Sequence, residues 1–178
     1  MDLIAALLDL CKASERPIIA IDGPAGAGKT TLAATIKMAL APQLSVQVIH
    51  MDDLYNGWRF ALGNELTSVL QNIVKAHQDK KPYVFNKYDW SQGDFGEEQN
   101  LESADLLILE GVGSGQRSIR ENLSTLIWVD IAPVAGVARV LNRDGFDLEP
   151  QMREWLIAQS QHFRANSTQE ESEFILTN

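Results

Sequence analysis

The chain alternates between short, continuous apolar runs and longer stretches in which apolar residues recur at helical spacing. Continuous apolar runs of this kind are typical of strands that a parallel sheet buries on both faces. They lie at Pro17–Asp22, Val46–Met51, Asp105–Gly111 and Thr125–Ile131, and the closing letters EFILTN, Glu173–Asn178, predict a fifth strand.

Apolar residues three and four positions apart predict a helix before the first strand and helices between the later ones. The predicted helices cover Leu3–Cys11, Thr30–Ala41, Leu62–Val74, Pro133–Asp144 and Glu149–Ala165. Strands that alternate with helices indicate a parallel sheet covered on both faces. The pattern therefore predicts an α/β fold, with one three-layer α/β/α domain over residues 1–178 and a mainly parallel five-stranded sheet.

Residues 79–100 depart from this alternation. The segment is polar and aromatic and has no clear period. We therefore expect a long loop or irregular insertion there, and a loop of this length in a compact domain usually serves function.

Composition restricts the partners. The 178 residues carry a formal net charge of −9, and Lys and Arg form no cluster, which argues against binding to nucleic acid or to a membrane surface. Asp2 and Asp9 oppose a signal peptide, so we expect a cytoplasmic protein. Cys11, the one cysteine, falls in an apolar helical pattern and is expected to be a packing residue.

The sequence GPAGAGKT, Gly23–Thr30, follows the first predicted strand and leads into a helix. It matches the phosphate-binding motif G-x-x-x-x-G-K-[ST], in which glycines let backbone N–H groups surround the phosphates. We expect Lys29 to reach the β- and γ-phosphates and Thr30 to bind Mg²⁺. The predicted nucleotide-binding residues are Gly23, Pro24, Ala25, Gly26, Ala27, Gly28, Lys29, Thr30 and Thr31. The motif and the alternating elements together indicate a P-loop NTPase domain.

The stretch Asn86–Asp89, NKYD, matches the N-K-x-D motif with which GTPases recognise guanine. In GTPases, however, a D-x-x-G strand end comes between the phosphate loop and this motif. Here NKYD precedes the strand LLILEG, which ends in Glu110-Gly111 and contains no D-x-x-G. The order of motifs therefore disfavours a GTPase.

The second predicted strand ends in DDLY, so Asp52 and Asp53 are expected at the edge of the sheet where ligands bind. A carboxylate there could accept a proton from an attacking hydroxyl, and we favour Asp52 over Asp53 for this role. The structural alternative is a helix N-cap. Glu110 ends another strand and is expected to orient Mg²⁺ through water, with capping of the next loop as its alternative.

Arg139 and Arg143 lie four residues apart on one predicted helix face. Two guanidinium groups could clamp the transferring phosphoryl group. The alternative is an exposed pair that bridges to Asp144 or Asp147. Among the aromatic residues, Trp58 and Trp90 could line an acceptor pocket or simply pack, whereas Trp128 and Trp155 are expected in the core. The three histidines, His50, His77 and His162, are too dispersed to suggest a metal site.

In this order of motifs the chain resembles the uridine kinase branch of P-loop kinases, which includes phosphoribulokinase-like and pantothenate kinase-like enzymes. The resemblance implies that Asp52 is the general base and that Arg139 and Arg143, on a lid over about residues 139–150, close over ATP. It also implies that the segment 79–100 serves the acceptor site. The residues implied to contact the acceptor are Asp53, Tyr55, Tyr88 and Asp89.

The chain departs from this family pattern at three places. The lid has two arginines where uridine kinases have more, Leu54 replaces an aromatic residue, and KYDW lacks a nearby His-x-Arg. These changes leave the catalytic frame but remove the basis for naming uridine as acceptor.

The sequence thus predicts an ATP- and Mg²⁺-dependent kinase that phosphorylates a hydroxyl group of a small molecule. Lys29, Asp52, Arg139 and Arg143 are the predicted catalytic residues, and Thr30 and Glu110 the predicted metal-site residues. Two alternatives stay open, namely a regulatory nucleotide switch and a nucleoside monophosphate kinase. The oligomeric state is open as well, with a homo-oligomer among the options.

Overall fold

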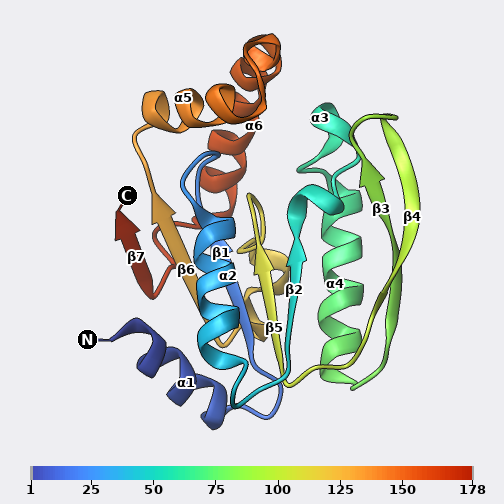
Figure 1. Ribbon diagram of the computed structural model, residues 1–178, viewed down its shortest axis with the longest axis vertical. Helices are drawn as coiled ribbons and strands as arrows, with labels where there is room; N and C mark the ends of the chain where they lie inside the picture. Colours follow the sequence, from blue (N-terminus) through green and yellow to red (C-terminus); the bar gives the residue numbers. More distant parts are fainter. Residues whose placement is uncertain (1, 178) are drawn as a thin grey trace.

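A computed structural model describes residues 2–177. Met1 and Asn178 lie outside the described residues. They are the two ends of the predicted domain, and Asn178 is also the end of the predicted last strand. Five parallel strands form the central sheet in the order β2-β5-β1-β6-β7, as Figure 1 shows. They are β1 (Ile18–Asp22), β2 (Val46–His50), β5 (Leu106–Glu110), β6 (Thr125–Asp130) and β7 (Phe174–Thr177). The predicted α/β fold with a five-stranded parallel sheet is confirmed.

Helices cover both faces of the sheet. On one face lie α1 (Leu3–Ala13) and α2 (Lys29–Leu40), and the opposite face carries α4 (Asn64–Gln78) and α6 (Glu149–Asn166). The helix α5 (Pro133–Asp144) lies past the carboxyl end of β6. All five predicted helices are present. Short helical turns complete the list: η1 (Met51–Asp53), α3 (Gly57–Phe60), η2 (Arg117–Asn122) and η3 (Phe146–Leu148).

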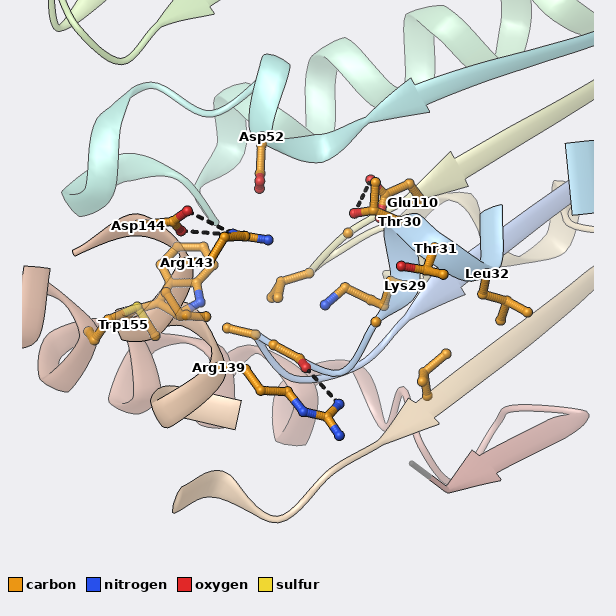
Figure 2. A pocket seen from close by; sticks show the side chains of 18 of the residues that line it. Lys29, Thr30, Thr31, Leu32, Asp52, Glu110, Arg139, Arg143, Asp144 and Trp155 are labelled. Carbon is orange, nitrogen blue, oxygen red and sulfur yellow. Dashed lines mark hydrogen bonds and ion pairs between the residues drawn. The ribbon is translucent and has the colours of Figure 1, made fainter. Parts of the chain in front are cut away.

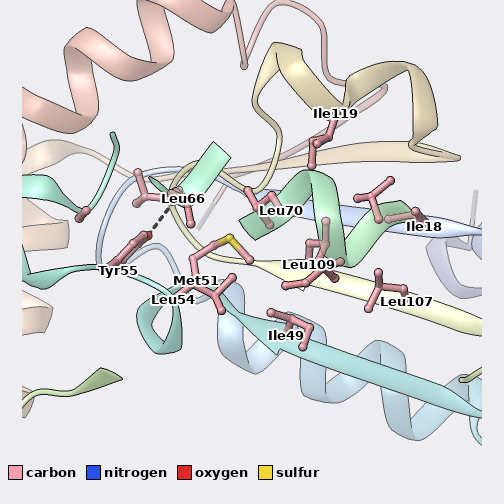
Figure 3. Close-up of a cluster of buried hydrophobic side chains, with 14 of the residues drawn as sticks. Ile18, Ile49, Met51, Leu54, Tyr55, Leu66, Leu70, Leu107, Leu109 and Ile119 are labelled. Atoms are coloured by element: carbon pink, nitrogen blue, oxygen red, sulfur yellow. Dashed lines mark hydrogen bonds between the residues drawn. The ribbon is translucent and has the colours of Figure 1, made fainter. Parts of the chain in front are cut away.

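Alternate residues of the central strands point to opposite faces, so the sheet separates two hydrophobic clusters. Ile19 and Ile21 of β1 pack towards α1 and α2, whereas Ile18 packs towards α4. Every residue of β1 and β5 is buried, which is why both strands read as continuous apolar runs. Figure 3 shows the cluster on the α4 side of the sheet, in which Leu66 and Leu70 of α4 face the sheet. Cys11 is buried, as predicted.

The prediction of an irregular insertion over residues 79–100 is wrong. The segment forms an antiparallel hairpin of β3 (Tyr83–Asp89) and β4 (Asp94–Leu101) beside α4. Backbone pairing and the tight turn between the strands hold it, and most of β4 is exposed. A register shift between Asn86 and Tyr88 also disturbs the alternation of β3. Both features removed the period-2 signal on which strand prediction depends.

The predicted lid over residues 139–150 comprises the second half of α5, η3 and the start of α6. Among residues 2–177, no helix combines the length and apolar character needed to cross a membrane.

Candidate active site

The phosphate-binding loop follows the carboxyl end of β1 and runs directly into α2. Gly23 and Gly26 have φ angles of +139° and +77°, in the left-handed region that favours glycine. A Cβ atom at Gly26 would lie 2.3 Å from the carbonyl oxygen of Gly136 in α5. The glycines of the motif thus allow the backbone to turn sharply and α5 to pack directly on the loop.

The loop borders a cavity of about 970 Å³, a volume in the range of small-molecule sites. Its phosphate-loop end is lined by Gly26, Gly28, Lys29, Thr30, Thr31 and Leu32. Its aromatic end is lined by Tyr55, Trp58, Trp90, Leu148, Met152 and Trp155. Figure 2 shows Lys29 and Asp52 between Leu32 at one end and Trp155 at the other. Asp52 therefore lies between the phosphate-loop end and the aromatic end of the cavity.

Lys29 is largely buried, and its ammonium group donates a hydrogen bond to the carbonyl oxygen of Pro24 at 2.8 Å. Burial lowers the pKa of Lys29, and three neighbouring carboxylates oppose that effect. These belong to Asp22, Glu110 and Asp52. The lysine is therefore the positive centre of a cluster of acidic groups beside the phosphate loop.

Thr30 and Glu110 lie together, as the Mg²⁺ prediction requires. The Thr30 hydroxyl donates to Oε1 of Glu110 at 3.1 Å, and Glu110 is 5% exposed. No group of three or more His, Cys, Asp and Glu side chains suited to a metal occurs among residues 2–177. Mg²⁺ that binds with a nucleotide needs few protein ligands, because phosphates and waters supply the others. A hydroxyl beside a carboxylate fits that coordination.

His50 joins this pair, which the sequence did not indicate. Its Nδ1 lies 2.5 Å from Oε1 of Glu110, and this hydrogen bond raises the pKa of His50. The relevant signal was its position, since His50 ends β2 two residues before Asp52 and pairs in register with Glu110 at the same edge of the sheet. His50 thus fixes the orientation of the carboxylate that also holds Thr30.

The structure separates the two aspartates of DDLY. Asp52 lines the cavity, and its carboxylate accepts no hydrogen bond from the residues that the structure describes. Asp52 is exposed towards the cavity, yet the protein around it removes part of its hydration and so raises its pKa, and the nearby carboxylate of Glu110 raises it further. Asp53 instead forms an ion pair with Lys87 at 2.9 Å. Neither side chain caps η1, since the capping residue is His50, which makes no side-chain cap. The geometry thus favours Asp52 as the proton acceptor.

Both lid arginines line the cavity. Arg139 donates to the carbonyl oxygen of Gly26 at 3.4 Å. Arg143 makes two hydrogen bonds of 2.7 Å to the carboxylate of Asp144, so the alternative pairing with Asp144 does occur. Figure 2 shows that Arg143 nevertheless extends its guanidinium group into the cavity. Pairing with Asp144 therefore does not remove Arg143 from the site.

The residues implied to contact the acceptor have different positions. Tyr55 lines the cavity with its ring, and its hydroxyl donates to the carbonyl oxygen of Val112 at 2.7 Å. Tyr88 and Asp89 lie outside the lining of the cavity. Asp89 accepts hydrogen bonds from Ser91 and Gln92 in the hairpin turn, and the Tyr88 ring packs on Trp90. This arrangement does not favour direct acceptor contacts for Tyr88 and Asp89.

Three tryptophans meet at the aromatic end. The ring centroids of Trp58 and Trp90 lie 5.2 Å apart, and those of Trp58 and Trp155 lie 5.9 Å apart. Trp155 is buried, as predicted, but it also lines the cavity. Trp128 is buried in β6 and packs against Phe163, as expected of a core residue. Of the two interpretations for Trp58 and Trp90, the structure supports the pocket-lining one.

Asp22 is a buried carboxylate that sequence reasoning missed. It ends β1 and is fully buried, where it accepts hydrogen bonds from the backbone N–H groups of Gly23, Gly113 and Gly115. It therefore joins the phosphate loop to the loop after β5. Burial raises the pKa of Asp22 to about 6, although the three N–H groups and Lys29 oppose the shift.

The raised pKa of Asp22 predicts a pH effect on stability. The folded protein binds this proton more tightly than the unfolded chain, so its contribution to stability is full below about pH 4 and is lost as the pH rises towards 6. The pKa difference corresponds to about 3 kcal/mol. We expect the free energy of unfolding of Asp22→Asn to vary less between pH 4 and pH 7 than that of the wild type. Urea unfolding at each pH measures this, with the exposed Asp94→Asn as the control. A wild-type-minus-variant difference that stays constant with pH would contradict the prediction.

The chain is similar to known proteins in its three-dimensional structure. No family model matches the chain, and the curated proteins contain no match. A solved structure, "Possible Uridine Kinase from Bacillus stearothermophilus", superposes with a TM-score of 0.68 at 19% identity, over 99% of this chain and 100% of that one. The chain has the P-loop kinase fold.

Other structures with this P-loop kinase fold are similar as well. A "putative fructose transport system kinase from Silicibacter sp. TM1040" matches with a TM-score of 0.64 at 19% identity, and each chain is covered completely. Shikimate kinase from Acinetobacter baumannii, solved in complex with shikimate, matches with a TM-score of 0.53 at 16% identity over 94% of this chain and 87% of that one. The predicted resemblance to the uridine kinase-like group of P-loop kinases is thus confirmed at the level of the fold.

Proposed function

We propose that this protein is a kinase that uses ATP and Mg²⁺ to phosphorylate a hydroxyl group of a small molecule. The observation that carries the proposal is the position of Asp52 in the cavity. The phosphate loop lies on one side of it and a second, aromatic-lined space on the other. A proton acceptor between a phosphate site and a second ligand site is the arrangement that phosphoryl transfer between two ligands requires.

The residues of the cavity divide the chemistry among them. The phosphate loop and Lys29 hold the β- and γ-phosphates, and Arg139 and Arg143 neutralise charge on the transferring group. Thr30 and, through water, Glu110 would hold Mg²⁺, which would neutralise further negative charge when bound. The aromatic end holds the acceptor with its hydroxyl next to Asp52.

The reaction needs little covalent participation of the protein. The acceptor oxygen forms a bond to the γ-phosphorus while the bond from this phosphorus to the bridging oxygen breaks, and ADP leaves with that electron pair. The hydroxyl proton passes to Asp52. The raised pKa of Asp52 makes its carboxylate a better base than an aspartate of ordinary pKa. The two lid arginines close the cavity from α5 and limit the access of water.

The aromatic end makes a nucleoside monophosphate kinase the weaker alternative, because such an enzyme needs cationic side chains for the phosphate of its acceptor. Among the described residues, the cations that line the cavity are Lys29, Arg139 and Arg143. Lys29 and Arg139 donate to carbonyl oxygens of the phosphate loop, and Arg143 donates to Asp144. A regulatory switch would not need the second ligand space.

The test is transfer of labelled phosphate from [γ-³²P]ATP to a panel of neutral, anionic and cationic hydroxyl compounds. We expect at least one compound to become labelled and Asp52→Asn to abolish the labelling. Tight binding of nucleotide with no labelled product from any class of acceptor would favour the switch and contradict the proposal.

A further inference from the structure

The aromatic end of the cavity is built largely from four rings. Tyr55, Trp58, Trp90 and Trp155, here called the aromatic wall, come from three parts of the chain: the segment after η1, the hairpin turn and α6. Neighbouring centroids lie 5.2–5.9 Å apart: 5.4 Å for Tyr55 and Trp155, 5.9 Å for Trp58 and Trp155, and 5.2 Å for Trp58 and Trp90. Such contacts hold the rings in fixed orientations. The wall is therefore a preformed apolar surface.

The two outer rings of the wall are accessible to a ligand. Trp90 is 41% exposed and Trp58 is half-buried, whereas Tyr55 and Trp155 are buried. Val112, Leu148 and Met152 add further apolar surface around the rings. A ligand at this end thus meets aromatic faces and aliphatic groups, with the carboxylate of Asp52 at the boundary.

The cations that line the cavity are the ones that bind the phosphates of ATP in the proposed function. Of the cations that line the cavity within residues 2–177, Lys29 and Arg139 donate to carbonyl oxygens of the phosphate loop. Arg143 makes both of its short hydrogen bonds to Asp144. With these three cations occupied by the phosphates of ATP, an anionic group placed against the wall would lose water without gaining a cationic partner of its own, which is costly.

We propose, as a refinement of the proposed function, that the acceptor is an uncharged alcohol that carries a flat ring and stacks this ring on Trp58 and Trp90. Stacking of a ring on tryptophan matches the shape and polarity of the wall. A phosphate or carboxylate on the acceptor disfavours binding. The hydroxyl group lies on the side of the ring that faces Asp52.

Matched acceptors test this chemistry. Each neutral ring alcohol is paired with an analogue that differs by one anionic group: benzyl alcohol with 4-(hydroxymethyl)benzoate, and a nucleoside with its 3′-monophosphate. Choline serves as an acyclic cationic alcohol, since aromatic faces also bind ammonium groups. We expect labelled product from a neutral ring compound and kcat/KM at least about tenfold lower for its anionic partner.

Two variants separate stacking from folding. Trp58→Leu should raise KM for the neutral acceptor about tenfold with little change in kcat, and Trp58→Phe should retain most of the affinity. Trp128→Phe changes a buried tryptophan that is not part of the cavity lining and is the control. Quenching of tryptophan fluorescence measures acceptor binding independently of turnover.

The outcomes distinguish this inference from the proposed function. Transfer to the anionic partners or to choline in preference to neutral ring compounds would overturn the neutral ring acceptor but leave the kinase intact. The same conclusion follows if Trp58→Leu leaves KM unchanged. The absence of both transfer and quenching with every ring compound would overturn the inference, whereas quenching without any transfer would support the site and contradict the kinase.

A separate observation concerns the hairpin, which contacts the turn η1 at two neighbouring residues. The indole N–H of Trp90 donates to the backbone carbonyl oxygen of Asp52 at 3.0 Å. Lys87, from the NKYD stretch, forms its ion pair with the adjacent Asp53 at 2.9 Å. Neither contact involves the Asp52 carboxylate, so both act on the backbone and neighbour that orient it.

We infer that Trp90 is a positioning residue for Asp52. Trp90→Phe retains an aromatic ring in the wall but removes the N–H donor. We expect kcat to fall about tenfold while KM for the acceptor changes less than about threefold. The lower limb of the pH–rate profile should move as well, because the surroundings of the Asp52 carboxylate change.

Lys87→Met tests the second anchor and should also lower kcat more than it raises KM. Lys81→Met, an exposed lysine just before the hairpin, is the matched control. An unchanged kcat in Trp90→Phe would overturn the positioning role, and so would a rise in KM that accounts for the whole loss of kcat/KM.

Discussion

Lys29→Met is expected to lower kcat for phosphoryl transfer by about 10²–10³-fold, the usual cost of removing one group that stabilises transition-state charge. The physical reason is the position of the ammonium group. It belongs to the phosphate loop, where it interacts electrostatically with three carboxylates, those of Asp22, Glu110 and Asp52. Without Lys29, the incoming phosphates would meet these negative charges with reduced compensation.

A matched variant separates this effect from helix stability. Lys37 lies on the same helix, α2, and is exposed, so Lys37→Met changes the same residue type without touching the cavity. We expect Lys37→Met to retain wild-type kcat. Calorimetric titration with ATP should show weaker binding for Lys29→Met only. A Lys29→Met enzyme that keeps a rate within about threefold of the wild type would show that this lysine does not stabilise the transferring group.

Asp52→Asn is expected to lower kcat by about 10²–10⁴-fold, the range of a lost general base, and to leave ATP affinity nearly unchanged. The amide keeps the size of the side chain but cannot accept the hydroxyl proton. The pH dependence provides a second measurement. Since the pKa of Asp52 is raised, wild-type activity should fall on acidification at a pH above the ordinary aspartate range. This limb of the profile should be absent from the residual activity of Asp52→Asn.

The neighbouring aspartate is the natural control. Asp53 faces Lys87 rather than the cavity, so Asp53→Asn loses an anchor of η1 but not the proton acceptor. We expect it to cost at most about tenfold in kcat and to keep the acidic limb. A larger loss in Asp53→Asn than in Asp52→Asn would reverse the assignment of the base.

Much of the fold could be predicted from the sequence, because buried elements produce a clear pattern of apolar residues. The strands β1 and β5 are buried along their whole length and therefore appear as unbroken apolar runs. The phosphate loop was equally clear, since its chemistry demands glycines, Lys29 and Thr30 at fixed spacing. The hairpin does not require particular residue types at fixed spacing. Its pairing uses the backbone, which leaves the choice of exposed side chains in β4 almost free.

A site residue could be predicted where its position at the end of a strand indicates its role. It could not be predicted where its role depends on contact with a residue distant in the sequence. Asp52 and Glu110 each follow an apolar run, and this position alone indicates the ligand-binding edge of the sheet. The roles of His50 and Asp22 arise from contacts with Glu110 and Gly113, which are distant in the sequence. Tyr88 and Asp89 show the opposite case, in which a resemblance suggested a role but the hairpin turn holds both outside the cavity.

The contact between Gly26 and Gly136 has a consequence for how the site meets its nucleotide. A Cβ atom at Gly136 would lie 2.5 Å from the carbonyl oxygen of Ala25, so the two backbones touch with no side chain between them. Arg139 and Arg143 follow within the same helix, one and two turns after this contact. The backbone that carries both guanidinium groups is therefore preorganised by folding itself. Nucleotide binding then has to order only their side chains, and less conformational entropy opposes the assembly of the catalytic charges.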